Sequence, residues 1–266
     1  MNNGLDSKYF VNNNRMIKTP EGIEKARIAG QLAARVLHMI TPHVVPGVTT
    51  NELDRLCHDY IVNELQAIPA NIGYHGYEKT VCTSVNHVIC HGIPSDKALK
   101  KGDIVNIDVA LIKDGWYGDT SRMYYAGEPS IMARRLVDTT LEAMMAGIEV
   151  VRPGATLGDV GFAIAAVAHR EGFSIVEEYC GHGIGMGYHE DPQVLHYGEK
   201  SRGLVLQEGM LFTIEPMLNA GKKQNKVLGD GWTVVTKDHS LSAQWEHMVA
   251  VTKDGYEILT PWPEDN

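Results

Sequence analysis

The sequence is poor in cysteine and has no long apolar run. Its 266 residues include 4 cysteines, none of them in a C-x-x-C pair, so no disulfide framework is expected. The most apolar stretch, residues 162–168, is far shorter than the about 20 residues that span a bilayer. The N-terminus has no basic segment leading into an apolar one, which argues against a secretory signal. These absences predict a soluble protein of the reducing cytoplasm, with no membrane as partner.

Basic residues are also in deficit. Lys and Arg number 24 against 33 Asp and Glu, which leaves a formal net charge of −9. A dedicated nucleic-acid-binding protein offers positive charge to phosphates, so this composition argues against that class. It argues equally against an anionic membrane surface as the partner.

Along the chain, several helices precede a region of strands. The first 16 residues show no periodicity, so we expect a flexible extension over residues 1–16 and a single domain over 17–266. Thr19 followed by Pro20 predicts the start of a helix that runs to residue 40, and Thr49 with Glu52 predicts a capping box for a second helix. Two more helices fit residues 130–151 and 156–171. Asp114-Gly115 predicts a tight hairpin between strands 104–112 and 116–124, and mostly antiparallel strands after helices indicate an α+β fold.

The sequence contains an internal echo at a constant offset of 107 positions. Pro46-Gly47, with Thr49 and Glu52, recurs as Pro153-Gly154, with Thr156 and Asp159. Gly102, Ile107 and Asp108 recur as Gly209, Ile214 and Glu215. Self-similarity at one offset predicts two similar halves, each with two helices and then a strand that ends on a carboxylate. The alternative is coincidence among residues that are common at helix starts and in strands.

Asp108 and Asp119 are acidic residues within apolar strand sequences. If Asp114-Gly115 forms a two-residue turn, Asp119 faces residue 110 and is a diagonal neighbour of Asp108, about 7–8 Å away at the backbone. Two buried carboxylates at that spacing repel each other unless a cation lies between them. The alternative is that both face solvent, as most acidic side chains do.

A glycine-rich segment and two further acids add to this pair. Residues 180–189 hold four glycines around His182 and His189, which predicts a loop in which a histidine is functional. Glu215 closes an apolar strand and Glu246 lies inside another, although each acid taken alone is equally an exposed or ion-paired residue. Four carboxylates and one imidazole favour divalent Mn, Fe, Co or Zn, and two ions would balance the four negative charges.

Eight segments then form a specific combination. They are Ile17 to Lys25, Gly73-Tyr74-His75-Gly76-Tyr77, Cys90-His91-Gly92-Ile93-Pro94, Gly102 to Asp108, Gly115 to Ser121, Gly181 to Gly185, Phe212-Thr213-Ile214-Glu215-Pro216 and Ser242 to His247. With these segments the sequence resembles the bacterial type I methionine aminopeptidases over about residues 17–260. The resemblance implies the pita-bread α+β fold, with two pseudo-twofold halves around a central antiparallel sheet. It also implies removal of the initiator methionine from newly made proteins when the second residue is small.

The same resemblance implies roles for individual residues. Two divalent ions would be held by Asp108, Asp119, His182, Glu215 and Glu246, with Asp119 and Glu246 able to bridge both. Glu215 would accept a proton from the attacking water, His91 would contact the region of the scissile amide nitrogen, and His189 would polarise the carbonyl oxygen. The methionine pocket maps to Tyr74, Tyr77, Cys82, Tyr188 and Trp232. Tyr188 departs from the phenylalanine that is common there. A monovalent-cation site is expected from backbone oxygens near Asn86, Val88 and Ser242.

Partners and alternatives complete the hypothesis. The expected partners are N-termini of nascent polypeptides, with transient contact to the ribosome, and the protein is expected to be a cytoplasmic monomer. One alternative is an Xaa-Pro aminopeptidase or prolidase-like enzyme of the same fold, although such enzymes carry a large additional N-terminal domain. Another is a catalytically inactive binding protein of this fold, although such relatives have lost metal ligands, whereas all five expected ligands are present in this sequence.

Overall fold

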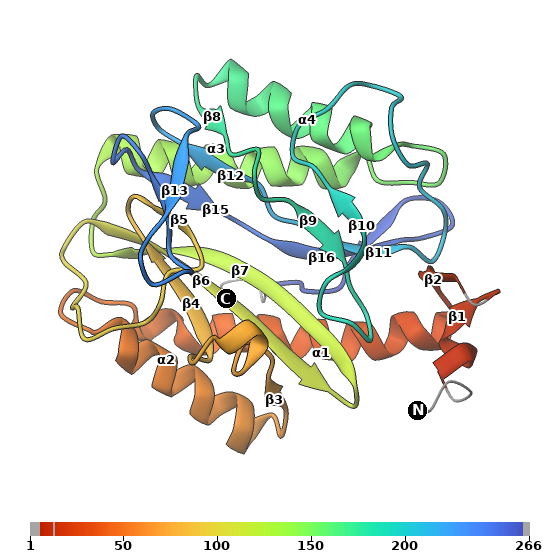
Figure 1. Ribbon diagram of the computed structural model, residues 1–266, viewed down its shortest axis with the longest axis horizontal. Helices are drawn as coiled ribbons and strands as arrows, with labels where there is room; N and C mark the ends of the chain where they lie inside the picture. The colour runs from red at the N-terminus through yellow and green to blue at the C-terminus, as the bar shows by residue number, and fades with distance from the viewer. Residues whose placement is uncertain (1–5, 13, 263–266) are drawn as a thin grey trace.

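Two pairs of helices lie on opposite sides of a layer of strands (Figure 1). The structure, a computed structural model, describes residues 6–12 and 14–262. On one side lie α1 (Pro20–Ile40) and α2 (Thr50–Asp59), and on the other α3 (Ile131–Glu149) and α4 (Leu157–Arg170). No helix among the described residues is long and apolar enough to cross a membrane.

The strands pair antiparallel throughout the described ladders. Their bounds are β1 (Phe10–Val11), β2 (Asn14–Lys18), β3 (Ile68–Pro69), β4 (Val81–Val85), β5 (Val88–Cys90), β6 (Asp103–Lys113), β7 (Trp116–Ala126), β8 (Ser174–Ile175), β9 (Gly181–Gly183), β10 (Glu190–Val194), β11 (Leu211–Ile214), β12 (Met217–Asn219), β13 (Asn225–Val227), β14 (Val234–Thr236), β15 (Ser242–Gln244), β16 (His247–Val251) and β17 (Tyr256–Ile258). The larger sheets are β3-β6-β4 with β7 on β6, and β10-β9-β11-β16-β17. A bridge between Ser121 and Glu246 joins β7 to the start of β16, so the two sheets meet at the centre.

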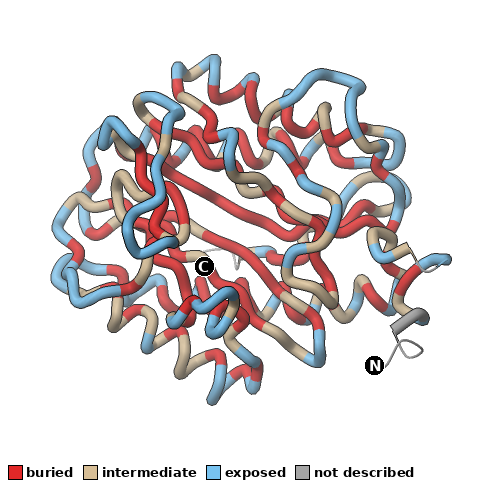
Figure 2. Tube along the Cα trace, viewed as in Figure 1, coloured by how far each residue is buried: buried red, intermediate tan, exposed pale blue. Residues whose placement is uncertain are grey.

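Each helix pair covers its own apolar core. Residues of α1 and α2 pack with β6 and β7, whereas residues of α3 and α4 pack with β11, β12 and the segment from β15 to β16. The inner strands are buried along most of their length, and the exposed segments lie at the periphery (Figure 2). The predicted α+β fold, with helices and antiparallel strands, is therefore confirmed.

The predicted hairpin has the expected register. Lys113 pairs with Trp116, and Ala110 pairs with Asp119, around a turn at Asp114 and Gly115. Asp108 lies two residues along from Ala110, so it shares a face with Asp119 as predicted. One detail differs: Asp108 lies in the middle of β6 rather than at the end of a strand.

The internal echo corresponds to a repeated backbone arrangement. Gly47 N–H donates to the carbonyl oxygen of Leu99 at 2.8 Å, and 107 positions later Gly154 N–H donates to that of Leu206 at 3.0 Å. Gly47 and Gly154 both have positive φ, 96° and 88°, a conformation that glycine adopts without a steric penalty. The isolated bridges Thr49–Ala98 and Thr156–Val205 repeat at the same offset. Equivalent hydrogen bonds at one offset support two structurally similar halves.

The two helix starts differ in their caps. At α4, Thr156 and Asp159 form the complete capping box. At α2, the Thr49 hydroxyl accepts from Glu52 N–H at 3.1 Å, but the Glu52 carboxylate forms an ion pair with Arg55 at 2.7 Å. The capping box predicted at α2 is therefore only half formed, because Arg55 lies within reach on the same exposed face.

The chain before Met16 is more regular than the predicted extension. Among its described residues, β1 pairs with β2, so the expected boundary at residue 16 falls inside a strand. Phe10 is 6% exposed, and the Tyr9 ring meets the edge of Trp116 with 5.5 Å between ring centroids. Residues 1–5 of the predicted extension lie outside the described residues.

Candidate metal centre and substrate cavity

Backbone pairing across the two large sheets brings five predicted ligands together. Asp108 and Asp119 come from β6 and β7, and His182 comes from β9. Glu215 follows the last residue of β11 directly, and Glu246 precedes β16. Glu246 N–H donates to the carbonyl oxygen of Ser121 at 3.1 Å, which fixes this acid beside the Asp108–Asp119 face.

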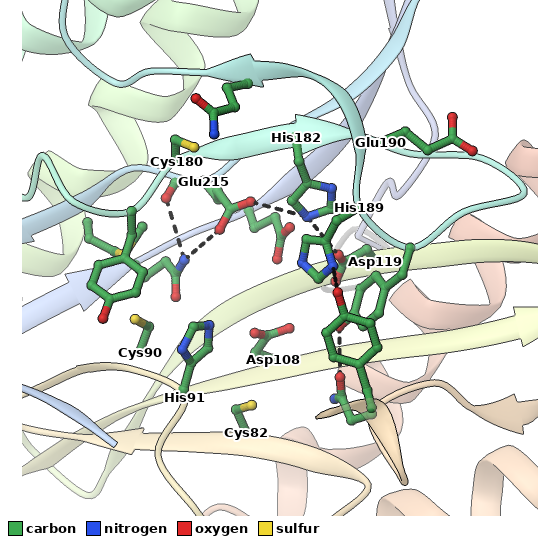
Figure 3. A pocket seen from close by; sticks show the side chains of 18 of the residues that line it. Cys82, Cys90, His91, Asp108, Asp119, Cys180, His182, His189, Glu190 and Glu215 are labelled. Atoms are coloured by element: carbon green, nitrogen blue, oxygen red, sulfur yellow. Dashed lines mark hydrogen bonds and ion pairs between the residues drawn. The ribbon is translucent and has the colours of Figure 1, made fainter. Parts of the chain in front are cut away.

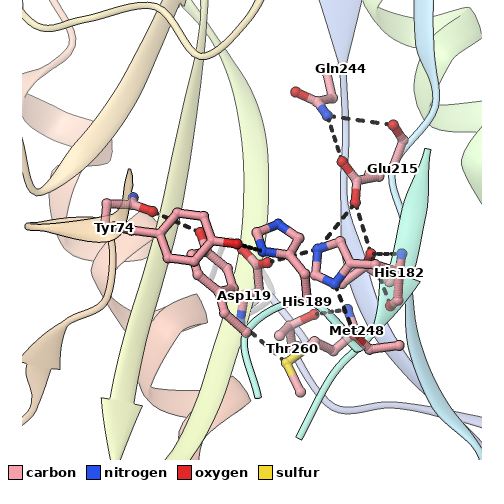
Figure 4. A network of polar contacts seen from close by, with 12 residues as sticks. Tyr74, Asp119, His182, His189, Glu215, Gln244, Met248 and Thr260 are labelled. Atoms are coloured by element: carbon pink, nitrogen blue, oxygen red, sulfur yellow. Dashed lines mark hydrogen bonds and ion pairs between the residues drawn. The ribbon is translucent and has the colours of Figure 1, made fainter. Parts of the chain in front are cut away.

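The side chains of Asp119, His182 and Glu215 point toward one another (Figures 3 and 4). Asp108 lies beside them (Figure 3). His182 Nε2 lies 3.5 Å from Asp119 Oδ2 and 3.7 Å from Glu215 Oε1. One ligand atom from each of Asp119, His182 and Glu246 lies within 4.8 Å of the others. Within the described chain, Oδ1 of Asp108 is buried without any hydrogen-bond partner. Buried polar atoms are normally satisfied, so an orphaned carboxylate oxygen beside other acids indicates that these residues fit a cation.

The electrostatics of the cluster lead to the same conclusion. Burial, followed by the charges of Asp119 and Glu215, raises the pKa of Asp108 well above its ordinary value. Burial and the neighbouring acids raise the pKa of Glu246 in the same way. Burial alone would lower the pKa of His182, but the hydrogen bond to Asp119 and the charges of Glu215 and Asp119 raise it to about 9. Asp108 and Glu246 therefore resist ionisation unless positive charge is supplied, and the donor set fits divalent metal ions.

Neighbouring polar groups orient two of the predicted ligands, Glu215 and His182. The Thr213 hydroxyl donates to Glu215 Oε1 at 2.8 Å, and Gln244 Nε2 donates to Glu215 Oε2 at 3.2 Å. His182 Nδ1 lies 3.0 Å from the carbonyl oxygen of Gly183, which favours the tautomer with Nε2 free to bind a metal.

The glycine-rich segment forms a strand at His182, and the prediction of a loop there is wrong. Gly181–Gly183 is β9, between β10 and β11. A Cβ on Gly183 would lie 2.0 Å from the carbonyl oxygen of Asp191, and one on Gly181 would lie 2.3 Å from that of Thr213. The glycines serve here for close approach of neighbouring strands, and the irregular loop begins only after β9.

His91 and His189 flank the acidic cluster. His91 has a φ of 56°, an unusual conformation for a non-glycine residue, and its ring packs edge-on against Tyr179 with 5.6 Å between ring centroids. His189 Nδ1 lies 2.7 Å from the Tyr74 hydroxyl, and its ring centroid lies 4.2 Å from that of His182. Burial, together with the charge of His182, lowers the pKa of His189 to about 4, and burial lowers the pKa of His91 as well.

One cavity of about 790 Å³ connects these groups. Its lining includes the five predicted metal ligands, both flanking histidines, and the predicted pocket residues Tyr74, Tyr77, Cys82, Tyr188 and Trp232. Ring centroids lie 5.0 Å apart for Tyr77 and Trp232 and also for Tyr74 and Tyr188. The Tyr188 hydroxyl, the group that phenylalanine would lack, donates to Asn71 Oδ1 at 2.7 Å. An aromatic wall and an acidic centre thus share one space.

Comparison with known proteins decides the family. Residues 24–253 match metallopeptidase family M24. The chain belongs to this family. Family M24 membership makes it a peptide-bond hydrolase that depends on metal, in agreement with the ligand cluster.

Curated and solved members of family M24 are similar over most of the chain. The methionine aminopeptidase of Escherichia coli (strain K12) is 60% identical over 250 residues, which cover 94% of this chain and 95% of that protein. The crystal structure of methionine aminopeptidase from Rickettsia prowazekii has a TM-score of 0.91 at 57% identity and covers 92% of this chain and 99% of that one. The prolidase from Pyrococcus furiosus, at 24% identity and a TM-score of 0.73, shares the fold, and the match covers 66% of its chain. These neighbours confirm the predicted pita-bread fold.

The cavity of this M24 chain has further lining residues that sequence reasoning missed. Asn14 to Met16 reach its wall from β2, in the segment expected to be an extension, and no local pattern signalled this. Asn71, which holds Tyr188, likewise carries no signal. Gln244 could have been found, because it stands two positions before Glu246 and alternate positions of an extended segment share a face.

Proposed function

We propose that this protein removes the initiator methionine from newly made polypeptides in the cytoplasm when the second residue is small. The observation that carries the proposal is the single cavity, in which an aromatic pocket adjoins four carboxylates and an imidazole. The chain's 60% identity to a curated methionine aminopeptidase over 94% of its length supports it.

The pocket suits a methionine side chain. A thioether is flexible, and its sulfur makes favourable contacts with aromatic rings. Tyr74, Tyr77, Tyr188 and Trp232 supply such rings, and Cys82 pairs with Asp108 across β4 and β6, close to the acidic centre. At about 790 Å³, the cavity has room for the residues that follow the methionine as well.

The metal ligands proposed are Asp108, Asp119, His182, Glu215 and Glu246. When bound there, two divalent ions supply positive charge that lowers the pKa of a water molecule and polarises the substrate carbonyl. We propose two ions because two divalent charges balance the four negative charges of the carboxylates. We propose Co, Mn, Fe or Zn because the donor set suits all four.

His189 is proposed to donate a hydrogen bond to the oxygen of the scissile carbonyl. The Tyr74 hydroxyl, 2.7 Å from Nδ1, can donate to that nitrogen and leave the proton on Nε2. A neutral imidazole held in this tautomer is a hydrogen-bond donor aimed into the cavity, where negative charge develops on the carbonyl oxygen.

Glu215 and His91 are proposed to act on either side of the scissile bond, Glu215 on the attacking water and His91 on the amide nitrogen. Thr213 and Gln244 hold the Glu215 carboxylate in one orientation, from which it accepts a proton from the attacking water. His91 lines the same cavity and is proposed to contact the departing amide nitrogen.

Other predicted features stay proposals that rest on the family resemblance. For the monovalent cation, Asn86 and Ser242 lie together, since Ser242 N–H donates to the Asn86 carbonyl oxygen at 2.8 Å, and Val88 lies on β5. Higher turnover in potassium buffer than in a tetraalkylammonium buffer would support that site. We also propose a monomer with transient ribosome contact, which sedimentation with and without ribosomes tests.

The activity is tested with Met-Gly-Met and an Xaa-Pro peptide, using protein purified without oxygen and supplied with Mn²⁺. Cleavage of the first peptide only is expected, whereas preference for the Xaa-Pro peptide would favour a prolidase-like enzyme. Failure to bind any divalent metal would favour an inactive binding protein.

His189→Ala should lower kcat by about 100- to 1,000-fold, because it removes one donor to a developing oxyanion. Metal content should stay unchanged, and an equal loss of metal would make His189 a ligand instead.

A further inference from the structure

Lys18 is a buried cation that the proposed chemistry does not use. Its side chain is 0% exposed, and its Nζ donates to Glu190 Oε2 at 2.8 Å and to the carbonyl oxygen of Arg15. Its own backbone is fixed as well, because Lys18 N–H donates to the Gly209 carbonyl oxygen at 2.8 Å at the start of the segment that leads into β11. The ammonium group is therefore held at a defined place beneath the cavity wall.

The segment above Lys18 is the one that carries His189. Glu190 Oε1 accepts from Gly187 N–H at 2.7 Å, so a single carboxylate joins Lys18 to Gly187. Gly185 lies directly on the lysine, since a Cβ there would come within 2.8 Å of Lys18 Cε. Figure 3 shows Glu190 pointing away from the acidic cluster, next along the chain from His189. Residues 188 and 189 thus lie within a short loop that is closed by the hydrogen bond between Gly187 N–H and the Glu190 carboxylate.

We propose that Lys18 is a positioning residue, which acts through Glu190 to hold the loop that carries His189 in the geometry needed for turnover. This inference rests on the proposed function. The physical reason is that the Glu190 side chain is only 10% exposed. A buried carboxylate is stable there only while it is paired, so without the ammonium group it turns toward solvent and releases Gly187.

The expected effect is partial, because His189 has a second support. The Tyr74 hydroxyl contacts its Nδ1 at 2.7 Å, and the Tyr188 hydroxyl is bound to Asn71. A displacement of about 1 Å at a reacting group costs on the order of 100-fold in rate. We therefore expect Lys18→Met to lower kcat by about 10- to 100-fold, with a smaller change in KM.

The experiment measures kcat and KM for Met-Gly-Met, with metal content and thermal unfolding, in full-length protein loaded with Mn²⁺. The variants are Lys18→Met, Glu190→Gln, His189→Ala and the double variant Lys18→Met/His189→Ala. Glu190→Gln keeps the shape of the side chain and an oxygen that accepts from Gly187 N–H. It should therefore lose less activity than Lys18→Met, and it should fold even if Lys18→Met does not. Arg27→Met is the matched control. Arg27, on α1, likewise forms an ion pair with a residue distant in the sequence, Glu257, at 2.6 Å, but it does not touch the loop that carries His189.

The double variant decides the inference. If Lys18 acts through His189, Lys18→Met should cost less than about threefold once His189 is already alanine, because coupled residues are not additive. The Arg27 control should keep wild-type kcat. Wild-type kcat in both Lys18→Met and Glu190→Gln, or a full Lys18 effect in the His189→Ala background, would overturn it. Loss of metal in step with activity would also overturn it. If the wild-type protein itself does not cleave Met-Gly-Met, the proposed function fails instead.

Discussion

Replacing Glu215 by glutamine should stabilise the protein when metal is removed, although Glu215 is proposed to bind metal. The carboxylate is 14% exposed and lies 3.7 Å from His182 Nε2. Burial is the main cause that raises its pKa, from the ordinary 4.5 to about 7, even though the charge of His182 acts in the opposite direction. The folded, metal-free protein therefore resists ionising this group.

The magnitude follows from that pKa. At about 1.4 kcal/mol for each factor of ten, a pKa near 7 means that the charged carboxylate costs the folded protein about 3 kcal/mol. Because the folded-state pKa is raised, stability is full below pH 4.5 and is lost as the pH rises through 7. With an unfolding entropy of about 2.1 cal/mol/K per residue over 266 residues, 3 kcal/mol corresponds to a Tm difference of about 5 °C.

The assay is thermal unfolding in chelator at pH 5 and pH 8. Glu215→Gln should lie within about 2 °C of the wild-type Tm at pH 5 and exceed it by about 5 °C at pH 8. The exposed Glu208→Gln is the control and should leave Tm unchanged at both. Mn²⁺ at 100 times its Kd should stabilise the wild type by about 2.7 kcal/mol and the variant by less. A variant no more stable than wild type at pH 8 without metal would refute the reasoning.

Three further outcomes can be measured. Gly183→Ala should unfold the β9 region or lower the free energy of unfolding, measured by urea titration, by about 3 kcal/mol or more, because the added Cβ would lie 2.0 Å from a carbonyl oxygen of β10. Native-like stability would contradict the close approach of the two strands. Tyr188→Phe should change KM for Met-Gly-Met less than about tenfold, since it removes one hydrogen bond to Asn71, and a larger loss would give the hydroxyl a direct role in binding. A chain that starts at Met16 should lose about 2 kcal/mol of stability, because it lacks the buried Phe10, and an unchanged Tm would show that the segment contributes nothing.

Local patterns were sufficient for much of the fold. Thr19 and Pro20 predict the start of α1, and Asp114-Gly115 predicts the hairpin register that places Asp108 near Asp119. These features depend on hydrogen bonds and side-chain alternation within a few residues, which neighbouring sequence determines. The half-formed cap at Glu52 shows the limit, because Arg55 competes for the same carboxylate.

Long-range contacts decided the rest of the site. Glycines around His182 predict a loop locally, but two neighbouring strands that need close approach make Gly181–Gly183 a strand. Residues 14–16 have no periodicity of their own, and they reach the cavity because their backbone pairs and packs against distant segments.

By itself, the sequence determined the helix pairs, the hairpin, the duplicated halves and the identity of four acids and one imidazole as a candidate metal site. Only the tertiary structure decided that the Asp108 oxygen is orphaned, that Asn71 binds the Tyr188 hydroxyl, and that buried Lys18 lies beneath the loop of His189. The reason is physical: the cost of burying a charge or a polar atom depends on which distant groups surround it, and only the folded chain brings those groups together.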